Sequence, residues 1–236
     1  MTERYDEIAA AHYAAYRPPL HKIILGRVLS EDESFSLGLD VGCGTGYSAI
    51  ALADHCTRVY GIDPSPSMLT KATQHERVVY LGGAAERVPM PDGSVDVVTF
   101  AGSLFYADSD ETREEIRRVC RRGAVVVVYD FEVLLGEVLR RCGIDARAGE
   151  SDYDHRANFS GVARLTELAV GTEQVSLEVT ASELAHVLLS DSSRFDQLAK
   201  RHRATDPFVA LARELRSAYD RAMIEADIYY SKYQIA

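Results

Sequence analysis

Residues 39–46 read LDVGCGTG, and this short stretch decides the fold. It closes an apolar run over residues 35–41, which predicts a β-strand, and it precedes a helical pattern over residues 47–55. Glycines let the backbone turn tightly and approach a ligand closely. The helix start behind them leaves N–H groups for an anionic part of that ligand. The stretch therefore predicts a strand–turn–helix unit that binds a ligand.

Strand and helix patterns alternate outward from this turn. Nearly continuous apolar strands are buried on both faces, as in parallel sheets covered by helices. Two helices precede the first strand, and the pattern after residue 131 is less regular. The predicted strands are 35–41, 58–62, 77–81, 95–101, 124–129, 174–179 and 228–234, and the predicted helices are 4–16, 20–29, 47–55, 65–74, 111–120, 132–142, 182–189 and 207–226.

Composition limits the function classes. The chain has 236 residues, which fits one sizeable domain, and a net charge of −10, which disfavours nucleic acid as a partner. The arginine-rich stretch 113–122 contains Glu114 and Glu115 and is typical of a solvated helix face. A membrane span needs about 18 apolar residues in a row, and a secretory signal needs an apolar core near the N-terminus. We find neither pattern and expect a cytoplasmic protein.

Cysteine and histidine spacing indicates no metal centre. The four cysteines are far apart, without a CxxC pair, so we expect neither a zinc site nor a disulfide framework. Asp152, Asp154 and His155 form a local cluster without a recognised ligand spacing. We therefore predict that the protein holds no metal.

The spacing within the glycine turn discriminates between nucleotide ligands. A dinucleotide-binding turn has the pattern G-x-G-x-x-G, whose third glycine packs the helix closely on the strand. That position is Tyr47, which would obstruct this packing. The observed pattern is instead D-x-G-x-G-x-G, from Asp40 to Gly46. The turn therefore argues against a nicotinamide-dependent oxidoreductase.

An acidic residue follows the turn at the end of the second predicted strand. Asp63 comes 21 residues after Gly42. Its two oxygens can accept hydrogen bonds from both ribose hydroxyls of a ligand. A ribose is common to nucleosides and dinucleotides, so Asp63 does not separate them. The structural alternative is that Asp63 caps the next turn at Pro64 and Ser65.

Four motifs together resemble the class I S-adenosylmethionine-dependent methyltransferases, above all the bacterial small-molecule branch similar to ubiquinone/menaquinone methylases. They are residues 40–46, residues 61–69 (GIDPSPSML), residues 83–98 (GAAERVPMPDGSVDVV) and residues 118–124 (RVCRRGA), a degenerate version of the segment before the fifth strand. The match covers about residues 35–130. It implies a Rossmann-like α/β fold with a seven-stranded, mostly parallel sheet, helices on both faces and a last, antiparallel strand at 228–234.

The resemblance also implies roles for single residues. Gly42 and Gly44 would pass under the methionine part of the cofactor, and Asp63 would hold its ribose. Met68 would lie near the adenine, or alternatively in the core. Ala84 stands where many relatives have an Asp that binds the adenine. The implied cofactor-binding residues are Tyr16, Arg17, Asp40, Gly42, Gly44, Gly46, Asp63, Pro64, Met68, Ala85, Glu86, Ala101, Gly102 and Ser103.

The acceptor side is less defined. We predict one domain over 1–236, with a helical lid at 1–30, a cofactor-binding core at 35–130, and an acceptor-side insertion with the last strands at 131–236. Tyr16 and Arg17 would bind the cofactor carboxylate; alternatively, the tyrosine packs and the arginine caps a helix. His12, in the N-terminal helices, and His155 are weak candidates for a general base; for His155 the alternative is that a lone loop histidine is only solvated.

The sequence thus predicts an enzyme that transfers a methyl group from S-adenosylmethionine to an O, N or C atom of a small molecule and releases S-adenosylhomocysteine. We expect a monomer or homodimer that acts on neither nucleic acid nor membranes. One alternative is a non-catalytic S-adenosylmethionine-binding protein, and a remote one is the nicotinamide-dependent oxidoreductase. Acceptor pockets are built from variable loops, so the acceptor stays open.

Overall fold

The computed structural model describes residues 8–9, 11–12, 15–30, 32–144, 153–219 and 221–236. Internal contacts divide the chain into two compact units. The sheet unit comprises Pro19–Glu132, Tyr153–Glu173 and Ile228–Ala236, and the helical unit comprises Met1–Pro18, Val133–Asp152 and Gln174–Asp227.

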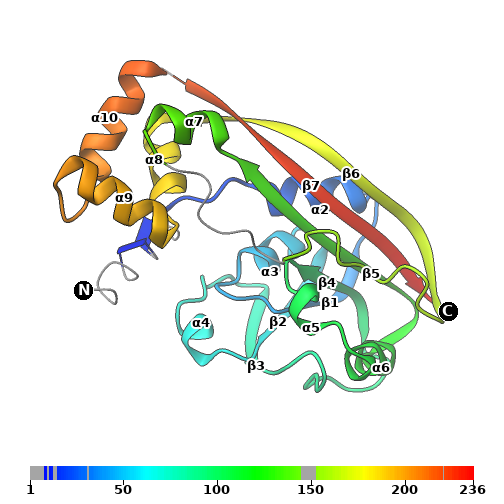
Figure 1. The fold of residues 1–236 in the computed structure, drawn as a ribbon. Helices are drawn as coiled ribbons and strands as arrows, with labels where there is room; N and C mark the ends of the chain where they lie inside the picture. The colour runs from blue at the N-terminus through cyan, green and yellow to red at the C-terminus, as the bar shows by residue number, and fades with distance from the viewer. Residues whose placement is uncertain (1–7, 10, 13–14, 31, 145–152, 220) are drawn as a thin grey trace. The chain divides into compact units, whose positions relative to one another are not determined.

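A seven-stranded sheet has the strand order β3-β2-β1-β4-β5-β7-β6. Neighbouring strands from β3 to β5 are parallel, and β7 runs against β5 (Figure 1). The predicted Rossmann-like sheet with an antiparallel last strand is therefore confirmed. The strands are β1 Phe35–Val41, β2 Cys56–Asp63, β3 Val78–Gly82, β4 Val95–Ala101, β5 Cys120–Leu134, β6 Leu165–Thr180 and β7 Arg221–Ile235.

Five labelled helices belong to the sheet unit: α2 Leu20–Val28, α3 Tyr47–Leu52, α4 Pro66–Thr70, α5 Leu104–Ala107 and α6 Asp110–Val119. Helix α4 is shorter than the predicted helix 65–74. Ser65 caps its start, and Pro66 occupies its first position. The chain leaves the helix because the Thr73 amide donates to the Thr45 carbonyl in the glycine turn, at 3.0 Å.

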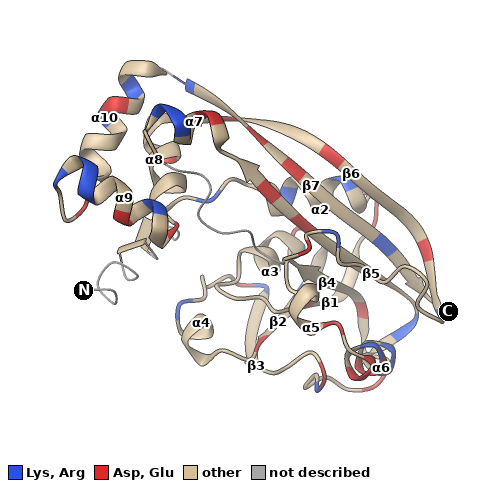
Figure 2. Ribbon diagram, viewed as in Figure 1, with Lys and Arg blue, Asp and Glu red and all other residues tan. Residues whose placement is uncertain are grey.

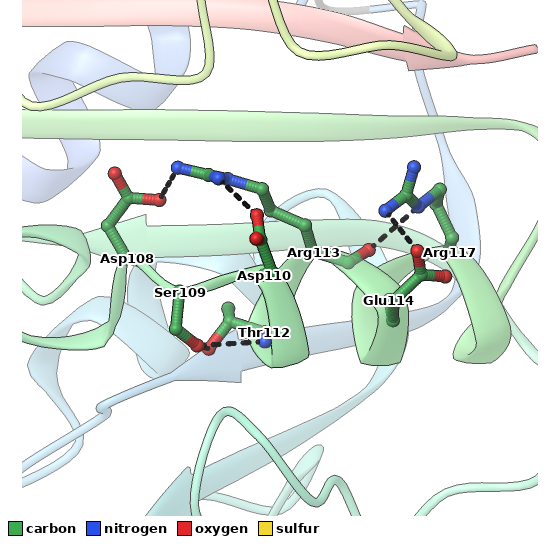
Figure 3. A network of polar contacts seen from close by, with 7 residues as sticks. All are labelled: Asp108, Ser109, Asp110, Thr112, Arg113, Glu114 and Arg117. Carbon is green, nitrogen blue, oxygen red and sulfur yellow. Dashed lines mark hydrogen bonds and ion pairs between the residues drawn. The ribbon is translucent and has the colours of Figure 1, made fainter.

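Helix α6 carries the arginine-rich stretch, and its charges pair along the helix (Figure 3). Arg113 contacts Asp108 at 2.6 Å and Asp110 at 2.7 Å, and Arg117 contacts Glu114 at 2.8 Å. Figure 2 shows acidic and basic segments intermixed on this helix. The predicted solvated helix face is confirmed.

The core of the sheet unit lies on the apolar residues of the inner strands. Every residue of β4 up to Phe100 is buried, as expected of a strand covered on both faces. Other members come from β1, β5, the last strand and the segment after residue 153. They include Leu39, Val41, Val98, Phe100, Val126, Val128, Phe159 and Tyr233.

The helical unit contains α7 Gly136–Arg141, α8 Ala181–Leu189, α9 Ser192–His202 and α10 Phe208–Ala218. The described residues within 8–15 are also helical, while the rest of the predicted helix 4–16 lies largely outside the described residues. A capping box of Thr180 and Glu183 starts α8. The predicted helix 207–226 is wrong in its second half, where β7 begins at Arg221. Helix α9 was not predicted.

Strands β5, β6 and β7 extend well beyond their predicted bounds. Residues 166–170 of β6 are exposed, and their apolar run, residues 168–170, is too short to predict a strand. In β7, Ala222, Ile224, Ala226 and Ile228 are buried and alternate with less buried residues. This period of two fits a strand, although the local composition favours a helix.

Two further findings concern the described residues. Within these ranges no helix has the length and apolar content that crossing a membrane requires. Cys43, Cys56, Cys120 and Cys142 are buried and form no disulfide.

Residues 1–18 and α2 belong to different units, so the predicted lid at 1–30 is divided between them. The lid and the single domain over 1–236 stay predictions.

Candidate functional site

The glycine turn joins β1 to α3 in a left-handed backbone conformation. Gly42, Gly44 and Gly46 have φ values of 71°, 51° and 90°. The amides of Gly42 and Cys43 donate to the Ile62 carbonyl at 2.8 and 3.0 Å, and the Gly46 amide donates to the Cys43 carbonyl at 2.8 Å. These N–H groups are bonded within the protein. The turn therefore lets a ligand approach the backbone closely, but these amides are not free to donate hydrogen bonds to that ligand.

The three glycines face different surroundings. A Cβ at Gly42 would lie 2.5 Å from the Cβ of Ser103, and one at Gly46 would overlap the Tyr80 hydroxyl. A Cβ at Gly44 would meet nothing within 4 Å. Gly42 and Gly46 thus admit neighbouring side chains, whereas Gly44 faces open space that a ligand can enter.

Asp63 connects the glycine turn to the loop after β2. Its Oδ2 accepts the Gly44 amide at 2.9 Å, and its Oδ1 accepts the Ser65 amide at 2.8 Å. The side chain is buried, while Pro64 next to it is exposed. Capping of the turn at Ser65 is therefore real. The Asp63 carboxylate can still accept hydrogen bonds from ligand hydroxyls, because each of its oxygens has a second lone pair.

Asp40 is fully buried on β1. Its Oδ2 accepts the Ser48 hydroxyl of α3 at 2.5 Å, and its Oδ1 accepts the Thr99 hydroxyl of β4 at 2.7 Å. Burial raises the pKa of Asp40 to about 6, against the two hydroxyl hydrogen bonds, and the nearby Asp63 raises it further. Asp40 therefore ties β1 to α3 and β4, and a direct cofactor contact stays a prediction.

The residues expected near an adenine follow β2 and β3. Met68 on α4 is 45 % exposed, so the alternative that it is a core residue is wrong. The Gly83 amide donates to the Asp63 carbonyl at 3.3 Å, which brings the loop after β3 beside the end of β2. In that loop Ala85 is buried and Glu86 is exposed. Their contact with an adenine stays a prediction.

The end of β4 lies between the glycine turn and the end of β5. The Ser103 hydroxyl donates to the Val41 carbonyl at 2.5 Å. Ala101 pairs with Tyr129 of β5. Gly102 has a φ of 68°, and a Cβ there would lie 3.1 Å from Oδ1 of Asp130. Residues 101–103 thus link the two strand ends.

A polar cluster of Asp130, Tyr153 and His155 adjoins Gly102. Asp130 Oδ2 lies 2.8 Å from His155 Nδ1 and 2.7 Å from the Tyr153 hydroxyl, which is also 2.8 Å from the Gly102 carbonyl. Burial, followed by the hydrogen bond to Asp130, raises the pKa of Tyr153, which stays a neutral phenol. An ionised carboxylate only accepts hydrogen bonds, so in a neutral imidazole Nδ1 carries the proton and Nε2 has the lone pair.

The family comparison agrees with this geometry. Residues 39–128 match the family model described as a methyltransferase domain, from the middle of β1 to β5. The resemblance to S-adenosylmethionine-dependent methyltransferases that the motifs predicted is confirmed.

Relatives of this methyltransferase domain come from several organisms. A candidate methyltransferase of Dictyostelium discoideum is 28 % identical over 123 residues, which are 52 % of this chain and 47 % of that protein. The malonyl-[acyl-carrier protein] O-methyltransferase of Serratia marcescens is 34 % identical over 108 residues, which are 44 % of this chain and 41 % of that protein. The matches thus span less than half the length of these two relatives.

Solved structures share the fold along most of the chain. A candidate type II methyltransferase of Anaeromyxobacter dehalogenans has a TM-score of 0.64 and 24 % identity, covering 92 % of this chain and 97 % of that one. The YcgJ protein of Bacillus subtilis has a TM-score of 0.54 and 17 % identity, covering 91 % and 98 %. At these identities the likeness shows the fold alone.

Three predicted site residues lie in the helical unit. His12 is buried, with its Nδ1 2.9 Å from His186 Nδ1 and its Nε2 3.4 Å from Asp206 Oδ1. Tyr16 packs on the apolar core of this unit, where burial raises its pKa. Arg17 is half-buried. Their roles toward a cofactor or an acceptor stay predictions.

Several residues of the candidate site were not found from the sequence. Asp130 directly follows the predicted strand 124–129, and the rule that ligands bind at the carboxyl ends of parallel strands could have found it. Ser48 and Thr99 carry no local signal, because only the fold brings their hydroxyls to one carboxylate. Asp152 of the acidic loop cluster lies outside the described residues. The described residues contain no group of three His, Cys, Asp or Glu side chains placed to hold a metal ion.

Proposed function

We propose that this protein transfers a methyl group from S-adenosylmethionine to an O, N or C atom of a small molecule. One observation carries the proposal. The Gly44 amide and the Asp63 carboxylate are 2.9 Å apart across the ends of β1 and β2. This pairing unites the open face of the glycine turn with an acid that can bind ribose.

The described residues fit such a cofactor. The space beside Gly44 would accommodate the methionine part, because a Cβ at Gly44 would meet no atom within 4 Å. Asp63 keeps acceptor capacity for ribose hydroxyls. The exposed thioether of Met68 and the loop with Ala85 and Glu86 would border the adenine. Gly102 and Ser103 then separate the cofactor from the acceptor.

S-adenosylmethionine, when bound, supplies a methyl group on an activated sulfonium. The protein's contribution is mainly to position the two partners, which contributes up to about 7–11 kcal/mol to lowering a barrier. Ser103, held by the Val41 carbonyl, and Gly102, packed on Asp130, fix the backbone between the two sites. No cationic clamp is needed, since positive charge is lost during transfer.

The proposal includes the setting in which the enzyme acts. We place it in the cytoplasm, as a monomer or homodimer, with a small-molecule acceptor and without nucleic acid, membrane or metal. The net charge of −10 and the wide cysteine spacing support these assignments. The named activity of the Serratia relative is O-methylation, which supports an oxygen acceptor.

Two other functions compete with this one. A non-catalytic protein would bind S-adenosylmethionine without turnover, and Ala84, which replaces the common Asp, favours this alternative. A nicotinamide-dependent oxidoreductase would bind NADH, but Tyr47 replaces the third glycine that such a turn needs. Turnover with an acceptor distinguishes the proposed enzyme from the non-catalytic protein. Cofactor titration distinguishes it from the oxidoreductase.

The test is calorimetric titration of the full chain with S-adenosylmethionine, S-adenosylhomocysteine and NADH. We expect micromolar binding of the first two and none of NADH. Asp63→Ala should weaken binding at least tenfold, because a hydrogen bond to a charged group contributes about 1.5–3 kcal/mol. Asp54→Asn, a change at an exposed acid that pairs with Lys22, should leave affinity unchanged.

The outcomes separate clearly. Equal affinity in Asp63→Ala and the parent protein would refute the ribose assignment. Absence of binding by both sulfur compounds would refute the proposed cofactor, and binding of NADH would favour the oxidoreductase.

A further inference from the structure

We propose that two copies of this chain pair through the outer edge of β6, over residues 165–173 of the sheet unit. The two strands run antiparallel, are related by a two-fold axis at Ala169, and join the two sheets into one. This inference goes beyond methyl transfer and does not depend on it. It selects the homodimer over the monomer and names the surface that forms it.

Strand β6 lies at one edge of the sheet, with β7 as its neighbour on the inner side (Figure 1). Among the described residues, no strand pairs with its outer side. Backbone N–H and C=O groups that point outward from such an edge can bond to a further strand. The strand at the opposite edge, β3, has only five residues, whereas β6 has 16. The edge of β6 is therefore the longer template for pairing.

The first half of β6 is open to a partner. Residues 166–170 are all exposed, and both faces of the strand are open because successive side chains alternate between them. Leu168 is 50 % exposed and Val170 is 54 % exposed. Lysine or proline commonly protects an edge strand from pairing. Residues 165–180 contain no lysine, arginine or proline, and Figure 2 shows acidic but no basic segments along β6. The edge therefore lacks this protection.

The two faces of the segment carry different side chains. One face has Thr166, Leu168, Val170 and Thr172, and the other has Leu165, Glu167, Ala169, Gly171 and Glu173. Both acids are bound within their own chain, because Glu167 accepts the Ser160 hydroxyl at 2.6 Å and Glu173 pairs with Arg27 at 2.7 Å. The uncharged face, with its two exposed apolar side chains, is therefore the one that a second strand completes.

A two-fold axis restricts the ways in which two such strands can pair. The axis is perpendicular to the sheet, so both copies turn the same face to the same side. Residues that lie opposite each other must then belong to the same face. The axis therefore passes through a residue and not between two residues. Among the remaining registers, charge decides, because like charges directly opposite each other destabilise a pair of strands.

An axis at Ala169 gives the most favourable pairing. Leu168 then lies opposite Val170 of the second copy, and Thr166 lies opposite Thr172. Pairs of apolar side chains and pairs of threonines both stabilise neighbouring strands. Glu167 lies opposite Gly171, so no acid is directly opposite another.

The neighbouring registers bring acids together. An axis at Val170 places Glu167 directly opposite Glu173 of the second copy. An axis at Leu168 places the two Glu167 side chains on a diagonal, about 7–8 Å apart, with no cation beside them. With the axis at Ala169, the acid diagonal to Glu167 is Glu173, whose charge Arg27 already neutralises. Charge therefore favours the axis at Ala169.

The interface is small, so the dimer should dissociate on dilution. Interfaces below about 1,200 Å² are typical of weak association. Each copy also carries a net charge of −10, which opposes pairing. At about 0.15 M salt, charges separated by more than about 8 Å are largely screened. Measurements at this salt concentration should therefore detect the dimer.

The dimer is tested by sedimentation equilibrium of the full chain from about 1 to 100 µM, a range that detects micromolar dissociation constants. The parent protein should change from monomer to dimer. Val170→Lys places a charge against Leu168 of the second copy and should weaken dimerisation at least about tenfold. Val209→Lys, the same change at an exposed valine of α10, should have no effect.

The outcomes that overturn the interface are equally defined. They are a parent protein that stays monomeric, assemblies larger than a dimer, and an equal effect of the two lysine substitutions. Circular dichroism of each variant verifies that it is folded.

The register is tested by Ala169→Cys. Opposite residues of antiparallel strands have Cα atoms about 4.5–5.5 Å apart, within the range of a disulfide. Cys43, Cys56, Cys120 and Cys142 are buried, so they should not compete. In dissolved oxygen, Ala169→Cys should form a disulfide-linked dimer, whereas Thr166→Cys, which lies opposite Thr172, should not. Equal cross-linking of the two variants, or none in either, would refute the axis at Ala169.

This proposal and the proposed function fail in different ways. A dimer that does not bind S-adenosylmethionine would keep the interface and refute the methyl transfer. A monomer that binds S-adenosylmethionine would keep the proposed function and refute the interface.

Discussion

Replacing Asp40 by Asn tests how the glycine turn is supported. The carboxyl group is fully buried, and the hydroxyls of Ser48 and Thr99 both donate to it. Asn has nearly the same shape but no charge; one hydroxyl can donate to its amide oxygen, and the other can rotate to accept from its NH2 group. The substitution therefore removes a buried charge with little change in packing.

The magnitude follows from the pKa. Burial raises the pKa of Asp40 from 3.8 to about 6. This difference, at about 1.4 kcal/mol per pH unit, amounts to about 3 kcal/mol. Because the folded-state pKa is raised, the folded state favours the protonated form. Its stabilising contribution is complete below pH 3.8 and is lost as the pH rises through about 6.

The assay is urea unfolding, followed by circular dichroism, between about pH 4 and pH 8. The free energy of unfolding of Asp40→Asn minus that of the parent should rise by about 2.5 kcal/mol across this range, because the unfolded carboxyl is already partly ionised at pH 4. A flat difference for Asp40→Asn would refute the buried, ionised carboxylate at neutral pH.

Two further predictions follow from the glycine turn and the helical unit. Gly44→Val should stay folded, at a cost of about 1–3 kcal/mol for its left-handed backbone, but lose S-adenosylmethionine binding in calorimetry; retained affinity in a folded variant would contradict the open face. Gly46→Ala should instead lower Tm, because its Cβ overlaps Tyr80. Burial, and then His12, lower the pKa of His186, so stability should fall as the pH drops below about 6.5. Hydrogen exchange of α8 should show that lowering the pH to 5 destabilises His186→Gln less than the parent protein. An equal destabilisation of the two proteins would refute the assigned role of His186.

The methyltransferase core was largely predictable because its signals are local. The strands at 35–41 and 95–101 have the predicted bounds, since both are apolar runs closed by glycine-containing turns. Asp63 and the glycine turn are recognised by type and spacing, and β1 and β2 are paired neighbours, so their ends meet. A hydrogen bond then joins Gly44 to Asp63.

Other features were misread because their local patterns are ambiguous. Residues 219–226 contain Ala, Met and Glu, which favour a helix, yet β7 begins at Arg221. Pairing within the sheet and burial of alternate residues outweigh that preference. Helix α9 consists mostly of polar residues, so its sequence did not predict a helix, although Asp191 caps its first turn.

The sequence by itself determined the parallel-sheet core, the glycine turn and the acid that follows it, because each depends on residues close together in the chain. Only the tertiary structure brought Asp130 to His155 and Tyr153, across more than twenty residues, and gathered two hydroxyls on Asp40. It also placed His12 against His186 in the helical unit. Such contacts depend on which strand ends and loops meet in space, and neither periodicity nor motif spacing encodes that.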